Sequence, residues 1–232
     1  MTITHYIPNT LTCLSLVCGC ISCVMSFQGN ILAATLWIII GAAFDFLDGF
    51  AARILHAFSP IGKDLDSLAD LVSFGVAPGM IVFWLLSQAT PLLPFGSFNN
   101  HIPYFGFIIP VFSALRLAKF NIDKRQATSF IGLPVPAHAL FISSASYAVL
   151  PVIFTQPLVF TLCTLITILI SSLLLVSEIP MFSLKIKSLA WKGNEPRYIL
   201  VLSSILFIIF FGFLGVAGSI LLYIFLSIFN KK

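Results

Sequence analysis

Charged residues are scarce in this sequence. Only 9% of its 232 residues are Asp, Glu, Lys or Arg, whereas an ordinary soluble domain is about a quarter charged. That scarcity excludes a globular cytosolic protein, and 59% hydrophobic residues exclude a disordered chain. The net charge of +4 rests on twelve basic residues that form no dense block, which excludes a nucleic-acid partner.

Two further absences concern the N-terminus and the cysteines. The first six residues contain no Lys or Arg, so we expect no secretory signal with a basic n-region, and we interpret the first apolar stretch as a retained span. Only five cysteines are present, and four of them lie in that stretch. Buried free cysteines are common packing residues, so we expect no disulfide framework.

Apolar residues are abundant instead, with 24 Phe and long runs of Leu, Ile and Val. A membrane-spanning helix needs about 20 such residues. The runs lie near 8–28, 31–55, 66–89, 102–121, 135–154, 157–178, 197–212 and 215–229. The sequence therefore predicts an all-α polytopic membrane protein with about eight transmembrane helices in a single domain, 1–232. For the last stretch, about 197–229, one long bent helix is the alternative to two spans.

The distribution of positive charge predicts the orientation of these spans. If the loop containing Arg53 and Lys63 lies in the cytoplasm, eight spans place every other basic cluster, including Lys231 and Lys232, on the same side. Seven spans would put the two terminal lysines outside. The sequence thus predicts that both termini are cytoplasmic.

The acidic residues are concentrated in one region. Five of the eight fall between positions 45 and 70, namely Asp45, Asp48, Asp64, Asp66 and Asp70. A carboxylate within a span costs at least about 2.5–3.5 kcal/mol, so such groups are paired, hydrated or functional. Solvation at a helix end accounts for Asp64, which lies at a loop end, but not for the regular spacing of the other four.

That spacing places the four carboxylates on two helix faces. Asp45, Asp48, Gly49 and Ala52 follow the i, i+3, i+4, i+7 pattern of one face, and Asp66 and Asp70 are i and i+4 on the next span. The intervening loop is short, so we expect the two helices to be antiparallel neighbours. The carboxylates would then converge at the cytoplasmic membrane boundary, beside a pocket over Gly49.

Oxygen-only ligands without His or Cys favour a hard divalent ion such as Mg²⁺ or Mn²⁺. Four carboxylates are enough for two ions, a recurring device in phosphoryl chemistry, and Arg53 beside them suits a phosphate. The pattern favours a metal-dependent phosphotransfer site. The alternatives from the residues alone are a structural role at helix ends and an Asp-lined cation channel or transporter.

The same residues carry a family resemblance. Asp45-x-x-Asp48-Gly49-x-x-Ala52-Arg53, eight residues, Gly62, three residues, Asp66, three residues and Asp70 resembles the CDP-alcohol phosphotransferase signature at all eight fixed positions. The resemblance implies an integral membrane homodimer, dependent on Mg²⁺ or Mn²⁺, in which an alcohol displaces CMP from a CDP-linked donor. It implies that Asp45, Asp48, Asp66 and Asp70 hold two metal ions and that Asp70 is also the general base.

Further segments resemble one branch of that family, the CDP-diacylglycerol–serine O-phosphatidyltransferases. These segments are 7–12, 65–78, 114–121, 132–137 and 182–185. The branch implies CDP-diacylglycerol and L-serine as substrates, in the cell (inner) membrane with the active site on the cytoplasmic side. Glycerol phosphate, inositol and choline remain alternative acceptors. His138 departs from the branch pattern, and we interpret it as a packed or lipid-interface residue.

The remaining candidate site residues divide into two groups. The predicted nucleotide and donor contacts are Asn9, Thr12, Gly49, Ala52, Arg53 and Gly62. The predicted acceptor contacts are Arg116, Lys119 and Asn121, because one or two cations suffice for the single carboxylate of serine. Helix capping is the alternative role for Asn9 and Thr12, and marking the end of a span is the alternative for Arg116 and Lys119.

Overall fold

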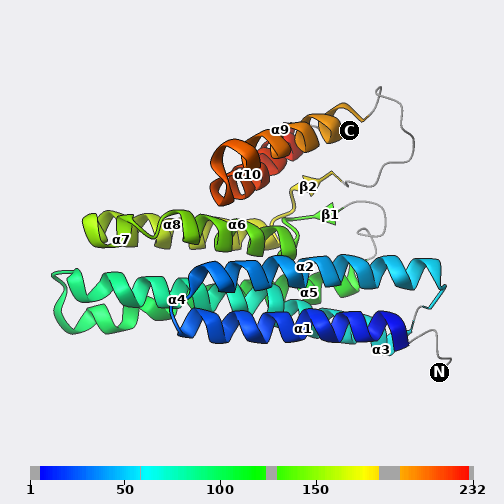
Figure 1. Ribbon diagram of the computed structural model, residues 1–232, viewed down its shortest axis with the longest axis horizontal. Coiled ribbons are helices and arrows are strands. Elements are labelled where there is room, and N and C mark those ends of the chain that lie inside the picture. The colour runs from blue at the N-terminus through cyan, green and yellow to red at the C-terminus, as the bar shows by residue number, and fades with distance from the viewer. Residues whose placement is uncertain (1–5, 58, 124–129, 183–193, 230–232) are drawn as a thin grey trace.

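The computed structural model describes residues 6–57, 59–123, 130–182 and 194–229. Helices run along the length of the molecule and stack in layers, with the C-terminal pair as a separate layer on the face opposite the N-terminal helices (Figure 1). The N-terminal half comprises α1 (Tyr6–Phe27), α2 (Ile31–Ile54), α3 (Pro60–Asp70), the π-helix η2 (Leu71–Val76), α4 (Ala77–Ala89), the 3-10 helices η3 (Thr90–Leu92) and η4 (Gly96–Phe107), and α5 (Ile108–Ile122).

The C-terminal half adds two further layers of helices. Its elements are β1 (Phe130–Ile131), α6 (Val135–Ala148), α7 (Val152–Thr155), α8 (Pro157–Val176), β2 (Pro180–Met181), α9 (Glu195–Phe211) and α10 (Phe213–Phe229). The only strands among the described residues are β1 and β2, which pair antiparallel with Ile131 opposite Pro180.

The prediction of an all-α membrane protein is confirmed. Within the described residues, five helical segments are long and apolar enough to cross a membrane. They are Tyr6–Phe27, Ile31–Ile54, Pro60–Leu92, Gly96–Ile122 and Pro157–Val176. Three predicted spans, those at 135–154, 197–212 and 215–229, fall on shorter helices, so the total of eight stays a prediction, as does the orientation of the termini.

The last apolar stretch forms two helices rather than one bent helix. Gly212 ends α9 with a φ of 57°, a left-handed conformation that glycine adopts without the penalty a side chain would bring. The chain reverses there, and α10 packs back along α9 (Figure 1). We call this pair the C-terminal hairpin.

Small residues let α1 approach its neighbours closely. Ser15 Oγ donates to the Gly41 carbonyl of α2 at 3.0 Å, and Ser73 Oγ of η2 donates to the Ser15 carbonyl at 2.9 Å. A Cβ on Gly19 would lie 2.6 Å from Ser73 Cα. Contacts of this kind drive helix association in lipid, where burial of apolar surface supplies little.

The second and third apolar segments are neighbours, as the short loop between them predicts. The contacts of α2 with the third segment lie mainly at η2 and α4, and α1 packs against α2, α3 and α4.

We predict that Gly19→Ala lowers stability, because its Cβ would collide with the backbone of Ser73 at 2.6 Å. Overpacking of this kind costs about 1–3 kcal/mol. The matched control is Gly41→Ala, whose Cβ would lie at 3.4 Å from Cys18 Cβ, an ordinary contact. Thermal unfolding in detergent should show a lower Tm for the first variant only, and equal values for the two would refute the close packing described here.

Candidate active site

The four predicted aspartates come together at one end of the bundle. Carboxylate oxygens of Asp45, Asp48 and Asp66 all lie within 4.8 Å of one another. Asp70 lies beside them, with its side chain in hydrogen-bond contact with Asp45. We call these residues the carboxylate cluster.

Local sequence determines where α3 begins and ends, and hence where its two carboxylates lie. Ser59 caps the helix by accepting a hydrogen bond from the Gly62 amide at 3.0 Å, and Pro60 occupies the first turn. Asp70 is the last α-helical residue before η2, in which the Ala77 amide bonds to the carbonyl of Val72, five residues back. Such π segments inside helices are frequent at functional sites.

One member of the cluster is fixed by a neighbouring helix. Asp48 is only 6% exposed, and Thr12 Oγ1 on α1 donates to its Oδ2 at 2.5 Å. The same hydroxyl lies 3.1 Å from the carbonyl of Pro8. A charge-assisted hydrogen bond compensates a buried carboxylate for lost hydration, so α1 supports the cluster as well as the packing.

A cavity of about 230 Å³ opens directly beside the cluster. Five of the six residues predicted to contact the donor line it, namely Asn9, Thr12, Gly49, Ala52 and Gly62, together with Asp48 and Asp66. The sixth, Arg53, is exposed on α2, the helix that also carries Gly49. Its Nε donates to the Gly49 carbonyl at 2.7 Å. Pro8, Ala57, Ser59 and Lys63 complete the lining of the cavity.

A buried arginine lies near Asp70 of the cluster. Arg116 on α5 is 6% exposed and interacts electrostatically with Asp70. Its guanidinium carbon lies 4.7 Å from the centre of the Phe120 ring. Within the described residues it makes no ion pair within 4.0 Å, and its Nε has no hydrogen-bond partner. A buried cation without a direct partner is costly, which marks this one as a candidate for binding an anion.

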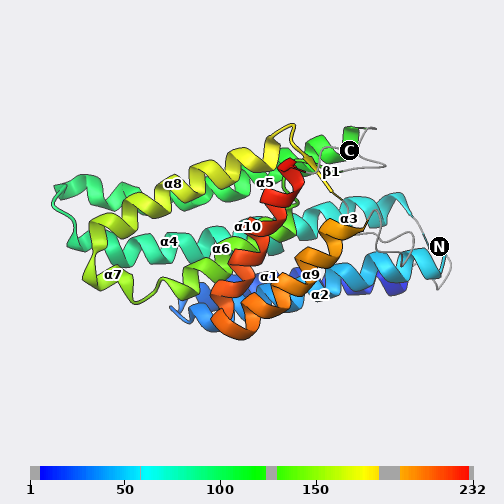
Figure 2. The ribbon, with the colours of Figure 1, turned by 90° about the horizontal axis from the view of Figure 1, so that it is seen from above.

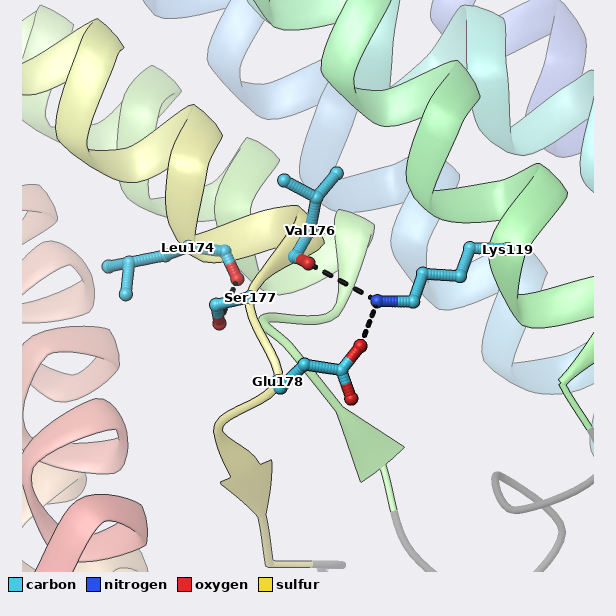
Figure 3. A network of polar contacts seen from close by, with 5 residues as sticks. All are labelled: Lys119, Leu174, Val176, Ser177 and Glu178. Carbon is cyan, nitrogen blue, oxygen red and sulfur yellow. Dashed lines mark hydrogen bonds and ion pairs between the residues drawn. The ribbon is translucent and has the colours of Figure 1, made fainter.

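The other two predicted acceptor residues have partners within the protein. Lys119 pairs with Glu178 and donates to the Val176 carbonyl at 3.4 Å, which ties α5 to the end of α8 (Figure 3). Asn121 Nδ2 donates to Ser67 Oγ at 2.8 Å, and its carbonyl accepts from Lys63 Nζ at 3.2 Å. Asn121 is thus held against α3, next to a residue of the cavity wall.

Comparison with known proteins identifies the group of enzymes to which this site belongs. A family model described as CDP-alcohol phosphatidyltransferase matches residues 5–171. The chain belongs to that family. It is therefore a transferase, which confirms the resemblance and the enzyme class predicted from the motif and disfavours the channel alternative.

Several curated relatives resemble this CDP-alcohol phosphatidyltransferase. CDP-diacylglycerol–serine O-phosphatidyltransferase of Bacillus subtilis is 38% identical over 149 residues, covering 64% of this chain and 80% of the relative. Archaetidylserine synthase of Methanothermobacter thermautotrophicus is 34% identical over 143 residues, covering 60% and 56%. A Helicobacter pylori CDP-diacylglycerol–serine O-phosphatidyltransferase is 32% identical over 140 residues, also covering 60% and 56%. The match thus spans just over half the length of the second and third relatives.

His138 is a packed residue in this member of the family. Its side chain is fully buried, and its Nε2 lies 3.0 Å from Ser171 Oγ, which links α6 to α8. This agrees with the interpretation made from the sequence.

We predict that Asp66→Asn abolishes transferase activity while the protein still inserts and purifies normally. The change removes one negative charge and one carboxylate oxygen from the cluster, without adding bulk. The control is Asp64→Asn, because Asp64 is exposed and outside the cluster. Release of CMP should be undetectable for the first variant and unchanged for the second. Substantial turnover by Asp66→Asn would refute the role of the cluster.

Proposed function

We propose that this chain transfers the phosphatidyl group from CDP-diacylglycerol to the hydroxyl of L-serine, giving phosphatidylserine and CMP. The observation that carries the proposal is the carboxylate cluster, which borders a cavity and lies near the buried Arg116, whose Nε has no hydrogen-bond partner among the described residues. The names of the relatives support serine as the acceptor, since two of those described are named for transfer to serine and the third is named archaetidylserine synthase.

The donor set of the cluster fits a hard divalent cation, because it consists of carboxylate oxygens alone. In our proposal Asp45, Asp48, Asp66 and Asp70 hold two ions, Mg²⁺ or Mn²⁺. When bound, such ions neutralise the pyrophosphate and stabilise CMP as a leaving group.

The residues of the cavity bind and orient the donor. Gly49 and Ala52 carry little or no side chain, so they leave space for the nucleotide beside Asp48. Asn9 and Gly62 are adjacent in the cavity wall, since a Cβ on Gly62 would lie 3.0 Å from Asn9 Oδ1. Thr12 holds Asp48, and Arg53 at the exposed edge pairs with a donor phosphate.

Asp70 and Arg116 act on the acceptor. The serine hydroxyl oxygen attacks the phosphorus of the phosphatidyl group, its proton passes to Asp70, and the bond to CMP breaks. Arg116 binds the serine carboxylate, with Asn121 as a supporting contact. Lys119 stays a predicted acceptor contact, although reaching the substrate would require it to leave Glu178.

The arrangement in the membrane is part of the same proposal. We infer eight spans with both termini in the cytoplasm, a location in the inner cell membrane, and an active site at its cytoplasmic face. Helices α9 and α10 have 17 residues each, or about 25 Å, which is slightly short for a hydrocarbon core of about 30 Å. A homodimer is proposed on the family resemblance.

The acceptor assignment is tested with purified protein, CDP-diacylglycerol and Mg²⁺ or Mn²⁺. We expect CMP release with serine and little with glycerol 3-phosphate, inositol or choline. A phosphorylated acceptor would require more cations than Arg116 supplies, and choline has no carboxylate for Arg116 to bind. Faster CMP release with glycerol 3-phosphate, inositol or choline than with serine would identify that compound, and not serine, as the acceptor.

We predict that Arg116→Lys raises the KM for serine, because a point charge replaces a planar two-point fork, and that Arg116→Ala raises it further. Loss of a charge-assisted hydrogen bond is worth about 1.5–3 kcal/mol, so kcat/KM for serine should fall about tenfold or more. The KM for CDP-diacylglycerol serves as the internal control and should change little. Equal weakening of both substrates would place Arg116 on the donor phosphates instead.

A further inference from the structure

A ring of hydrogen bonds joins α3 to the end of α5. Asn121 Nδ2 on α5 donates to Ser67 Oγ on α3 at 2.8 Å. Ser67 Oγ donates in turn to the Lys63 carbonyl at 3.2 Å, and Lys63 Nζ donates to the Asn121 carbonyl at 3.2 Å. Figure 2 shows α3 and the C-terminal end of α5 at the same end of the molecule, as does Figure 1. We call these three residues the α3–α5 latch.

The bond between Ser67 and Asn121 is the central one of the latch. The single hydroxyl proton of Ser67 goes to the Lys63 carbonyl, so the oxygen is left to accept from the Asn121 amide. Lys63 is exposed, whereas Ser67 and Asn121 are both half-buried. Water therefore competes least for the bond between Ser67 and Asn121, which makes it the strongest tie between the two helices.

A second close contact joins α5 to the same segment further along. A Cβ on Gly75 of η2 would lie 3.1 Å from Ser113 Cβ and 3.4 Å from Pro110 Cα, both on α5. Ser67 precedes Gly75 by eight residues, and Ser113 precedes Asn121 by eight residues. The segment from α3 to η2 therefore runs antiparallel to α5, and the latch and the Gly75 contact fix its register at two points.

The two groups proposed to act on the acceptor lie between these two points. Asp70 follows Ser67 by three residues, and Arg116 follows Ser113 by three residues. Residues three apart are neighbours on one side of a helix, so each group lies about one turn from a fixed point. The latch and the Gly75 contact together determine where Arg116 lies relative to Asp70.

The separation of these two groups matters because serine is small. In the proposed function its carboxylate binds Arg116 while its hydroxyl gives a proton to Asp70. Only two carbon atoms separate the carboxylate carbon of serine from its hydroxyl oxygen, so the substrate cannot adapt to a changed gap. A misplacement of about 1 Å can lower a rate about 100-fold.

We propose that the α3–α5 latch positions Arg116 relative to Asp70, and that Ser67 is a positioning residue for the reaction with the acceptor. The inference rests on the proposed function, in which these two groups act on serine. Ser67 occupies an unspecified position of the signature, between Asp66 and Asp70. Its role comes from its contact with α5 and not from the motif.

The test is Ser67→Ala, which removes the hydroxyl and leaves every aspartate in place. We expect kcat/KM for serine to fall about three- to tenfold, the effect of losing one hydrogen bond. The KM for CDP-diacylglycerol should stay nearly unchanged, because the donor cavity does not depend on the position of Arg116. Ser67→Thr keeps a hydroxyl at this position and should restore kcat/KM for serine.

The matched control is Ser87→Ala on α4. Ser87 Oγ donates to the Phe83 carbonyl, four residues back, at 2.8 Å, just as Ser67 Oγ donates to the Lys63 carbonyl. Unlike Ser67, Ser87 has no hydrogen-bond partner on another helix among the described residues. Both variants lose a bond within a helix, so only Ser67→Ala should lower kcat/KM for serine.

A double variant shows whether Ser67 acts through Asn121. In the Asn121→Ala background, Ser67→Ala should have no further effect on kcat/KM for serine, because the bond between them is already lost. A further loss in that background would overturn the inference. Equal loss for both substrates, failure of Ser67→Thr to restore activity, or no effect of Ser67→Ala would each do the same.

Arg116→Ala separates this inference from the proposed function. If Arg116→Ala raises the KM for serine and Ser67→Ala has no effect on kcat/KM, the proposed function stands and only the role of the latch is wrong. If Arg116→Ala leaves the KM for serine unchanged, the acceptor site itself is wrong, and the latch has no group to position.

Discussion

Repulsion within the carboxylate cluster is the constraint on which the arrangement of the helices depends. Two like charges 4 Å apart repel by about 4 kcal/mol at an effective dielectric constant of 20, and three of these carboxylates lie within 4.8 Å of one another. The protein holds them with close helix contacts through Ser15 and Ser73, and with a hydrogen bond from Thr12. A bound cation would relieve this repulsion. The same repulsion that destabilises the cluster therefore favours positive charge beside it.

Much of this organisation could be predicted from the sequence, because it depends on short spacings. The i, i+3 and i+4 spacing from Asp45 to Asp70 predicted that the aspartates converge, and five of the six predicted donor contacts line the cavity. The apolar runs predicted most helix boundaries to within a few residues. In each case the information lies within one or two helical turns, where geometry is fixed by the backbone.

The rest depends on contacts between residues distant in the chain. No local pattern shows that α1 would pack against both α2 and α3, because its small residues are ordinary in any membrane helix. The pairing of Lys119 with Glu178 joins residues 59 positions apart, and it gives that lysine a partner within the protein.

The π-helix η2 changes the direction in which side chains point along the third segment, so that α3 and α4 can present different faces. Each residue of an α-helix turns the chain by about 100°, so the extra residue in a π turn shifts the angular phase between the two parts of a continuous helix. Through Leu71–Val76, α3 directs Asp66 and Asp70 at the cluster while α4 keeps its own apolar face, which includes Ile81 and Leu85, in the core. A purely α-helical rod of this length would have to misalign one face to satisfy the other. Insertions and deletions in this stretch should therefore be tolerated far less than in the loops on either side.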